Sequence, residues 1–289
     1  MSDKNTFFHQ KLTLNVGGRL LDLAQPKVMG IVNITPDSFY DGGQTNTVGQ
    51  ALSQTGRMLE EGATFIDLGA YSSRPNAQHI TAEEELERLI PALKAIVKEF
   101  PQAIISIDTF RASIAKAAVD EGAHIINDIS GGEMDAAMFS TAGQLKVPYI
   151  LMHLKGTPQT MVSESTYTDV FEEVFQYFVA RSQRLRELGV LDIIIDPGFG
   201  FAKTADQSFE LLNKLDQFKM LELPVLAGLS RKSMICKTID TTPEFALNGT
   251  TAANTIALLK GAKILRVHDV KAAIEAVKIV ERTNFAQPV

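Results

Sequence analysis

The sequence contains one cysteine, Cys236, and no apolar run long enough to span a bilayer. A single cysteine excludes an intrachain disulfide and is typical of a protein from a reducing compartment. The first residues are polar and lack the apolar core and cleavage pattern of a secretory signal. Together these absences predict a cytoplasmic protein that does not bind a membrane.

An excess of basic residues is also missing. The 289 residues include 28 Lys and Arg against 34 Asp and Glu, which gives a formal net charge of −6. This balance argues against a general binder of nucleic acid, although it permits a local basic pocket for a small anion. Low-complexity segments, charge blocks and Pro/Gly-rich linkers are absent too, so the sequence predicts one domain over residues 1–289.

One pattern recurs along the chain. A helix-like stretch is followed by a glycine, then by a short apolar run, and then by polar residues. A glycine directly after a helix suits the left-handed conformation that ends many helices. The apolar runs are typical of strands that are buried on both faces of a parallel sheet. The four glycines are Gly62, Gly122, Gly189 and Gly261.

The complete pattern predicts an α/β protein with a (β/α)8 TIM barrel over residues 27–282, a fold of typically ~250 residues. A doubly wound open sheet is the alternative, but no glycine-rich dinucleotide fingerprint opens the chain. Residues 10–25 predict a short N-terminal β-hairpin that turns at Gly17 and Gly18, and we expect it to cover the bottom of the barrel. Four further apolar runs complete the eight strands, at residues 28–34, 104–108, 149–153 and 225–230.

Polar residues stand at the C-terminal end of nearly every predicted strand. Barrel strands all point the same way, so these residues meet on one face, which predicts an active-site mouth. For a single residue such as Asp108 or Asp128, helix capping is an equally good explanation. The set comprises Asn33, Asp67, Asp108, Asn127, Asp128, Met152, His153, Asp196, Ser230, Arg231, Lys232, Arg266 and His268.

Four of these residues are potential cations that follow the last two strands, namely Arg231, Lys232, Arg266 and His268. Barrels often hold phosphate at this place, so the cluster predicts a phosphate or diphosphate site in an otherwise acidic chain. A solvated ion-pair network is the alternative interpretation.

Two other strand ends suggest specific ligands. Asn33 offers an oxygen that suits a hard cation such as Mg²⁺, although an ordinary turn also explains an Asn. Asp196 can accept two parallel N–H bonds from the edge of a 2-amino-pyrimidinone ring. The alternative for Asp196 is a turn that begins before Pro197 and Gly198.

A family resemblance rests on seven motifs in fixed order. The stretches are "MGIVNITPDSFYDGG", "SSRPNA", "SIDTF", "INDISGG", "DPGFGF", "GLSRKS" and "RVHDV", and the match extends from about Val28 to Val280. In this order they resemble the dihydropteroate synthases of folate biosynthesis. The resemblance implies a transferase in which 4-aminobenzoate displaces diphosphate from (7,8-dihydropterin-6-yl)methyl diphosphate by an SN1-like substitution, giving 7,8-dihydropteroate.

The resemblance also assigns residues to the two substrates. Pterin would be held by Asp108, Asn127, Met152, Asp196, Phe201 and Lys232. Diphosphate would lie at Asn33, Arg266 and His268, with Mg²⁺ as cofactor at Asn33. 4-Aminobenzoate would lie at Phe39, Ser73, Arg74 and Ser233. Catalytic roles would fall to Asp41, Arg74 and Lys232, with Asp41 either stabilising the developing positive charge or pairing with Arg74.

The second loop departs from the family pattern. It commonly has a sequence close to "GGESTRPG", whereas this chain has "GAYSSRPNA" from Gly69 to Ala77. Arg74 and a hydroxyl at Ser73 remain, so activity is expected. The family further implies a homodimer through the late helices around residues 252–259. The rival interpretations are a methyltransferase that moves a methyl group from methyltetrahydrofolate to a corrinoid, and a catalytically silent member that only binds ligand.

Overall fold

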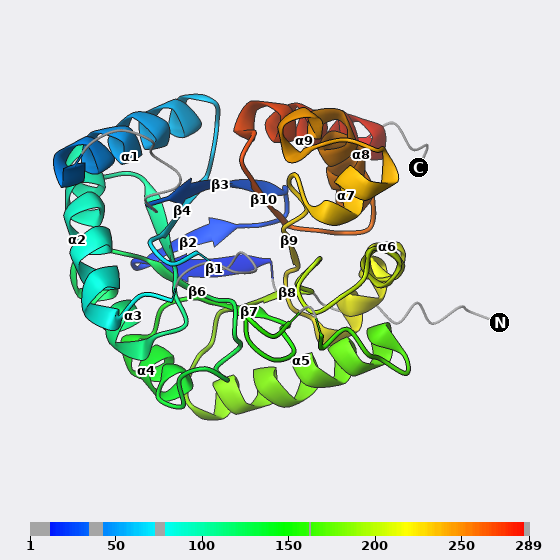
Figure 1. Cartoon of the computed structure of the whole chain (residues 1–289), viewed down its shortest axis with the longest axis horizontal. Helices are drawn as coiled ribbons and strands as arrows, with labels where there is room; N and C mark the ends of the chain where they lie inside the picture. The colour runs from blue at the N-terminus through cyan, green and yellow to red at the C-terminus, as the bar shows by residue number, and fades with distance from the viewer. Residues whose placement is uncertain (1–11, 35–42, 73–78, 162, 286–289) are drawn as a thin grey trace.

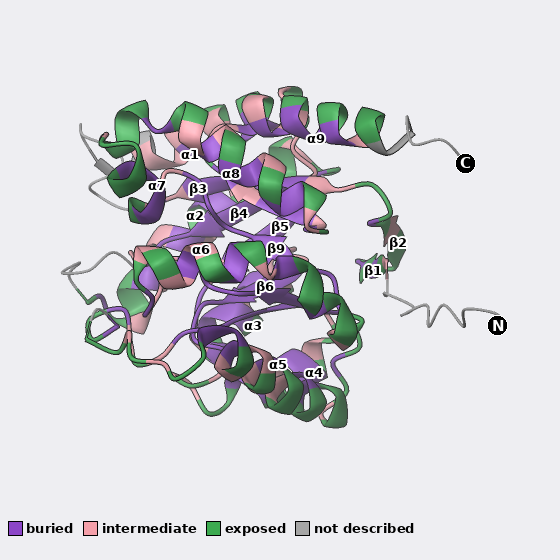
Figure 2. Ribbon diagram, turned by 90° about the vertical axis from the view of Figure 1, so that its right-hand side faces the viewer, coloured by how far each residue is buried: buried purple, intermediate pink, exposed green. Residues whose placement is uncertain are grey.

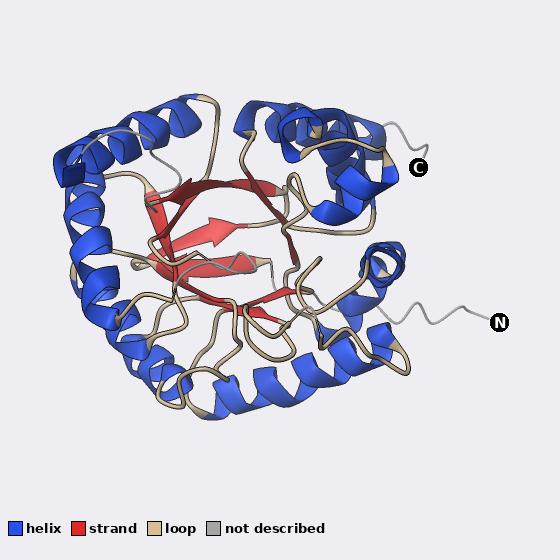
Figure 3. Ribbon diagram, viewed as in Figure 1, coloured by secondary structure: helices blue, strands red, loops and turns tan. Residues whose placement is uncertain are grey.

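The structure is a computed structural model that describes residues 12–34, 43–72, 79–161 and 163–285. Eight parallel strands curve into a barrel, and helices surround it (Figures 1 and 3). The strand order is β8-β7-β6-β5-β4-β3-β10-β9, and a bridge between Ile195 and Val225 links the two ends of the sheet. This confirms the predicted (β/α)8 barrel and shows that the open-sheet alternative is wrong.

The eight predicted strands are all present. They are β3 (Lys27–Asn33), β4 (Phe65–Gly69), β5 (Ile104–Asp108), β6 (Ile125–Asp128), β7 (Tyr149–Met152), β8 (Ile193–Asp196), β9 (Leu226–Ala227) and β10 (Ile264–Val267). Most match their predicted ranges within one or two residues. The run at 225–230 is the exception, because only two of its residues pair in the β9 ladder and the chain leaves the sheet from Gly228 onward.

Helices follow the strands and cover the outside of the barrel. They are α1 (Gly43–Glu60), α2 (Ala82–Glu99), α3 (Ala112–Asp120), α4 (Met138–Leu145), α5 (Val170–Glu187), α6 (Ala205–Asn213), α7 (Ser233–Thr238), α8 (Leu247–Leu259) and α9 (Val270–Phe285). The four predicted helix-ending glycines all have a positive φ, between 91° and 102°. None of the described helices is long and apolar enough to cross a membrane.

Alternation along the strands separates two apolar layers. Outward-facing residues such as Ile107 and Leu151 pack against the helices, and they belong to the largest buried cluster. Inward-facing residues at the N-terminal ends of the strands form a second cluster inside the barrel, which includes Phe65, Ile150 and Ile264. Above this second layer the inward positions become polar, and the functional groups lie there.

The N-terminal hairpin closes the bottom of the barrel, as predicted. Strands β1 (Thr13–Val16) and β2 (Arg19–Asp22) pair antiparallel around the Gly17–Gly18 turn, where both glycines have positive φ. Leu14, Val16 and Leu23 are buried in the same cluster as the inward residues of the barrel strands. Figure 2 shows the hairpin at one end of the barrel. Water is therefore kept from the lower interior.

We predict that Leu14→Ala lowers the free energy of unfolding by about 2–5 kcal/mol, the usual cost of a large cavity in a packed core. Leu14 is 1% exposed, whereas Leu20 on the same hairpin is 77% exposed. Leu20→Ala is therefore the matched control, with an expected change within about 0.5 kcal/mol. Urea unfolding followed by circular dichroism measures both. Equal effects in the two variants would show that the hairpin does not seal the barrel.

Candidate active site

The polar strand ends converge on the barrel face opposite the hairpin. Strand register places Gly69 beside Asp108, Asp108 beside Asn127, and Met152 beside Asp196. Because neighbouring strands are in register, inward-pointing side chains at these positions form one ring around the barrel axis. The predicted active-site mouth is therefore present in the described residues.

Arg266 is the centre of this ring. Its Nε donates to Asp67 Oδ2 at 2.6 Å, and its Nη2 donates to Asp108 Oδ2 at 2.6 Å. Asn127 Nδ2 donates to the same Asp67 oxygen at 3.0 Å. Asp67 is completely buried. Three strands thus fix the plane of the guanidinium, and two carboxylates compensate its charge.

Burial and the neighbouring charges shift the pKa values of Asp108 and Arg266. Burial raises the pKa of the Asp108 carboxyl to about 7, with the nearby Asp67 acting in the same direction and Arg266 opposing it. For Arg266, burial alone would lower the pKa, but the Asp67 and Asp108 carboxylates outweigh it and the pKa rises. Arg266 is therefore a permanent cation, whereas Asp108 changes its charge near neutral pH.

Asp196 lies across the ring at the end of β8. Its Oδ1 accepts a hydrogen bond from the Gly198 amide at 2.8 Å, while a Cβ atom at Gly228 would lie 3.7 Å from Oδ2. Burial raises the pKa of Asp196, and the cation of Lys232 is the largest opposing influence. A carboxylate has lone pairs beyond the one that the Gly198 amide uses, so it can also accept N–H groups from a ligand.

Lys232 lies close to Asp196 and carries a perturbed amine. Its Nζ donates to the Phe199 carbonyl and lies 4.3 Å from the centre of the Phe201 ring. Burial lowers the pKa of Lys232 to about 8, although the Asp196 carboxylate counteracts this. Phe201 and Met152, both predicted to line the pocket, share one apolar cluster with Ile129. A charged donor and an apolar wall therefore lie on the same side.

Three further predicted residues lie at the rim. His268 is exposed, and its Nδ1 lies 3.0 Å from Ser230 Oγ. Ser233 is the exposed first residue of α7. Asn33 ends β3 and is partly exposed. Phe39, Asp41, Ser73 and Arg74 lie outside the described residues.

Two strand-end residues do not belong to the site. Arg231 forms a bidentate ion pair with Asp269, with both N–O distances at 2.8 Å, and also donates to the Pro243 and Glu244 carbonyls. The phosphate interpretation of Arg231 is therefore wrong, and the ion-pair alternative holds for it. Asp128 points outward and receives hydrogen bonds from the Ser130 and Gly132 amides. It stabilises a turn, whereas Asp108 pairs with Arg266 and is no helix cap.

The unusual second loop begins with an anchored tyrosine. Tyr71 is 7% exposed, and its ring packs edge-on against Phe110 at a centroid distance of 5.0 Å. Its hydroxyl accepts a hydrogen bond from Gln159 Nε2 at 2.8 Å and lies 3.1 Å from His79 Nδ1. Tyr71, which stands where the family pattern has Glu, thus connects the start of this loop with the loop between β7 and α5.

Sequence reasoning missed the importance of Asp67 and Lys203. In the sequence Asp67 is one polar strand end among several, and the signal that it points into the barrel is its alternation with the inward-facing Phe65. Lys203 lies in the described loop after β8 and is 9% exposed. Nothing in its local sequence distinguishes it from an ordinary surface lysine.

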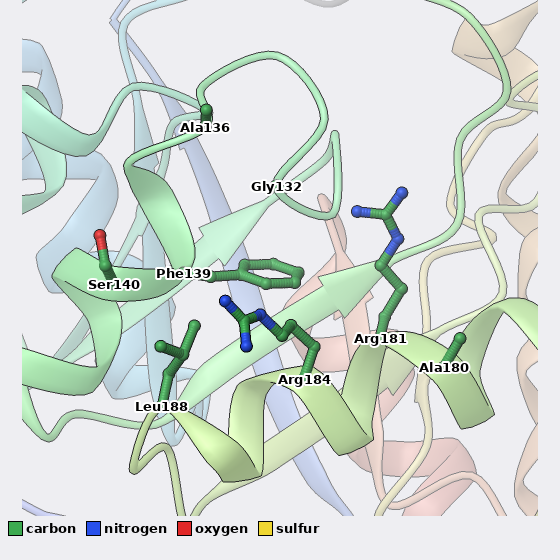
Figure 4. A pocket seen from close by; sticks show the side chains of 8 residues that line it. All are labelled: Gly132, Ala136, Phe139, Ser140, Ala180, Arg181, Arg184 and Leu188. Atoms are coloured by element: carbon green, nitrogen blue, oxygen red, sulfur yellow. The ribbon is translucent and has the colours of Figure 1, made fainter.

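A separate hollow lies on the outside of the barrel between α4 and α5, where Phe139 lies between Arg181 and Arg184 (Figure 4). Both arginines already have carboxylate partners, Glu133 for Arg181 and Glu187 for Arg184. Helices α4 and α5 and the loop after β6 line this hollow, and it contains none of the predicted site residues.

Comparison with known proteins decides the family. The family model for pterin binding enzymes matches residues 29–268. The chain belongs to the pterin-binding enzyme family, in its dihydropteroate synthase branch. Dihydropteroate synthase of Escherichia coli K12 is 42% identical over 272 residues, covering 93% of this chain and 96% of that protein.

Solved structures of this branch have the same fold. Xanthomonas albilineans dihydropteroate synthase with 4-aminobenzoic acid superposes with a TM-score of 0.89 at 39% identity, covering 96% of this chain and 99% of that one. The same enzyme in complex with 7,8-dihydropteroate gives a TM-score of 0.85 at 37% identity, covering 96% and 100% of the two chains.

We predict that Asp67→Asn weakens binding of an unphosphorylated pterin analogue roughly 10- to 100-fold, because charged hydrogen bonds contribute about 1.5–3 kcal/mol and Arg266 loses one of its carboxylates. Isothermal titration calorimetry measures the affinity. Asp120→Asn, at an exposed carboxylate that pairs with Lys116 on the same helix, is the control and should bind normally. Normal binding by Asp67→Asn would mean that Asp67 does not orient the site.

Proposed function

We propose that this chain joins 4-aminobenzoate to (7,8-dihydropterin-6-yl)methyl diphosphate, releasing diphosphate and forming 7,8-dihydropteroate. The observation that carries the proposal is the pair of Asp196 and Lys232 facing the Arg266 network across one barrel mouth. A pterin needs an acceptor for adjacent N–H groups, a donor for its carbonyl and a planar face to stack on. The ring of strand ends offers all three.

The pterin lies deep in this arrangement. Asp196 accepts from the 2-amino group and the neighbouring ring N–H, and Lys232 donates to the ring carbonyl. Asn127 and Asp108 bind the opposite edge of the ring. The guanidinium of Arg266, already fixed by two carboxylates, stacks on the ring face. Met152 and Phe201 supply the apolar wall.

The chemical step is a dissociative substitution at the pterin methyl carbon. The bond to the diphosphate oxygen breaks first, and the pterin ring delocalises the positive charge that remains. The amino group of 4-aminobenzoate then forms the new C–N bond and loses a proton. Arg266 and His268 stabilise the departing negative charge. Asp41 and Arg74, both outside the described residues, are proposed to act on the developing cation and on 4-aminobenzoate.

Magnesium fits this site only in part through protein groups. In the described residues no three His, Cys, Asp or Glu side chains come together as a metal site. Asn33 provides one amide oxygen at the mouth, which suits a Mg²⁺ ion that takes its other ligands from phosphate oxygens and water. Such an ion would neutralise charge on the leaving diphosphate.

The second substrate is proposed to approach from the rim. Ser233 at the start of α7, together with Phe39, Ser73 and Arg74, would bind 4-aminobenzoate. The related Xanthomonas albilineans structures with 4-aminobenzoic acid and with 7,8-dihydropteroate support both ligands.

One assay tests the function. Purified protein is incubated with the pterin diphosphate, 4-aminobenzoate and Mg²⁺, and dihydropteroate is detected by mass. Transfer of a methyl group to a corrinoid, without use of diphosphate, would favour the methyltransferase instead. Ligand binding without product would indicate a silent family member.

We further propose that a second copy of this chain covers the outer face of α8 and α9. Ala253, Ala257 and Leu258 of α8 face the barrel, so its exposed Ile256 and Leu259 are not needed for internal packing. Ile256 is 45% exposed, Leu259 62% and Ile279 on α9 66%. An apolar groove runs between the two helices.

Analytical ultracentrifugation tests this interface. The wild type should sediment with the mass of two chains, Ile256→Glu should sediment with the mass of one chain, and the control Leu20→Glu should behave as the wild type does. A wild type with the mass of one chain would contradict the proposal.

We predict that kcat/KM for the pterin diphosphate falls about tenfold per pH unit above pH 8. The Lys232 amine is charged below its pKa of about 8 and neutral above it, so the donor to the ring loses its charge as pH rises. Lys232→Arg keeps a permanent charge, so its lower activity should show no such decline. Rates from about pH 6.5 to 9.5 at fixed ionic strength measure this. The same decline in Lys232→Arg would assign it to another group.

A further inference from the structure

Lys203 is a buried amine that the proposed mechanism does not use. It lies at the end of the loop after β8, and the residue is 9% exposed. Its Nζ donates to the Phe201 carbonyl at 3.0 Å and to the Gly198 carbonyl at 3.2 Å, and lies 2.8 Å from His153 Nδ1. The His153 carbonyl oxygen lies 3.5 Å from Nζ. These partners are all neutral groups, and none is a carboxylate.

The three closest partners match the chemistry of the amine. Burial, with the nearby charge of Lys232, lowers the pKa of Lys203 well below its usual value. In its charged form the amine has three donors and no acceptor, so it needs acceptors within the protein when it is removed from water. Two carbonyl oxygens supply two of them. Burial, with the nearby Lys203, lowers the pKa of His153 to about 2, so the imidazole is neutral and its Nδ1 can be the third.

The loop that Lys203 holds has an unusual backbone. Gly198, Gly200 and Ala202 all have positive φ, at 67°, 74° and 49°. For Ala202 this left-handed conformation is disfavoured by its Cβ atom, so surrounding contacts must maintain it. The bonds from Lys203 to the carbonyls of Gly198 and Phe201 span this part of the loop.

This loop supplies the surroundings of Lys232. The Phe199 carbonyl accepts the hydrogen bond from Lys232, and the Phe201 ring lies beneath its amine. On the other side, His153 directly follows Met152, another pocket residue. The His153 ring is held edge-on against Tyr177 at a centroid distance of 4.8 Å, and the Tyr177 hydroxyl donates to the Met152 carbonyl. The position of His153 is thus fixed from behind.

We propose that Lys203 is a positioning residue that ties the loop after β8 to His153 and thereby presents Phe201 and the Phe199 carbonyl to Lys232. That the ligand is a pterin rests on the proposed function. Because Lys203 acts on the pterin side only, its loss should leave the diphosphate rim intact.

The first experiment replaces the amine by an apolar chain of similar length. Calorimetry on Lys203→Met should show about tenfold weaker binding of an unphosphorylated pterin analogue, with diphosphate affinity in the presence of Mg²⁺ unchanged within about twofold. Lys155→Met is the control, since Lys155 bonds the Thr166 carbonyl and Glu173 in the neighbouring loop and should keep wild-type affinity for both ligands. Wild-type pterin affinity in Lys203→Met, or equal loss of both ligands, would overturn the proposal.

The second experiment leaves Lys203 in place and covers the case in which its replacement does not fold. His153→Asn keeps an acceptor near the position of Nδ1, whereas His153→Leu removes it. Pterin affinity should stay within about threefold of wild type for Asn and fall about tenfold for Leu. Equal affinities in the two variants would overturn the role of the Lys203–His153 contact. A wild-type protein that binds no pterin would instead refute the proposed function, so the two failures are distinguishable.

Discussion

A guanidinium enclosed in the barrel is the constraint on which the site depends. A buried charge is costly unless it is paired and fully hydrogen-bonded, and Arg266 meets both conditions through Asp67 and Asp108. These partners come from β4 and β5, two and three strands away from β10. The ion pairs therefore fix the relative positions of strands that are distant in sequence, and the Arg266 side chain stays 20% exposed at the mouth.

The sealed lower barrel makes this arrangement effective. The hairpin and the apolar layer exclude water from below, so the polar ring lies in a medium of low dielectric constant. In such a medium burial moves the pKa of Asp108 up to about 7 and that of Lys232 down to about 8. A set of acids and bases that change charge near neutral pH is what a site needs to bind a polar ring and to separate charge during the reaction.

Much of this structure could be predicted from the sequence, for reasons specific to each element. Buried parallel strands are continuous apolar runs, and the glycines after helices mark their ends, so the barrel was predictable. The orientation of the Arg231 side chain could not be predicted, because it depends on tertiary contacts with Asp269 and with two backbone carbonyls. Lys203 was also hidden, because its role arises from His153, which is fifty residues away along the chain. Local sequence contains no signal for such a contact.

The proposed function requires a deep pterin site and a separate diphosphate rim at the mouth, and one titration tests this division directly. An unphosphorylated pterin analogue is titrated into the wild type, into Asp196→Asn and into His268→Ala. Asp196 is proposed to contact the ring, so Asp196→Asn should bind at least about tenfold more weakly, whereas His268→Ala should bind nearly as the wild type does. Equal losses in both variants would contradict the division, and wild-type affinity in Asp196→Asn would remove that carboxylate from the site.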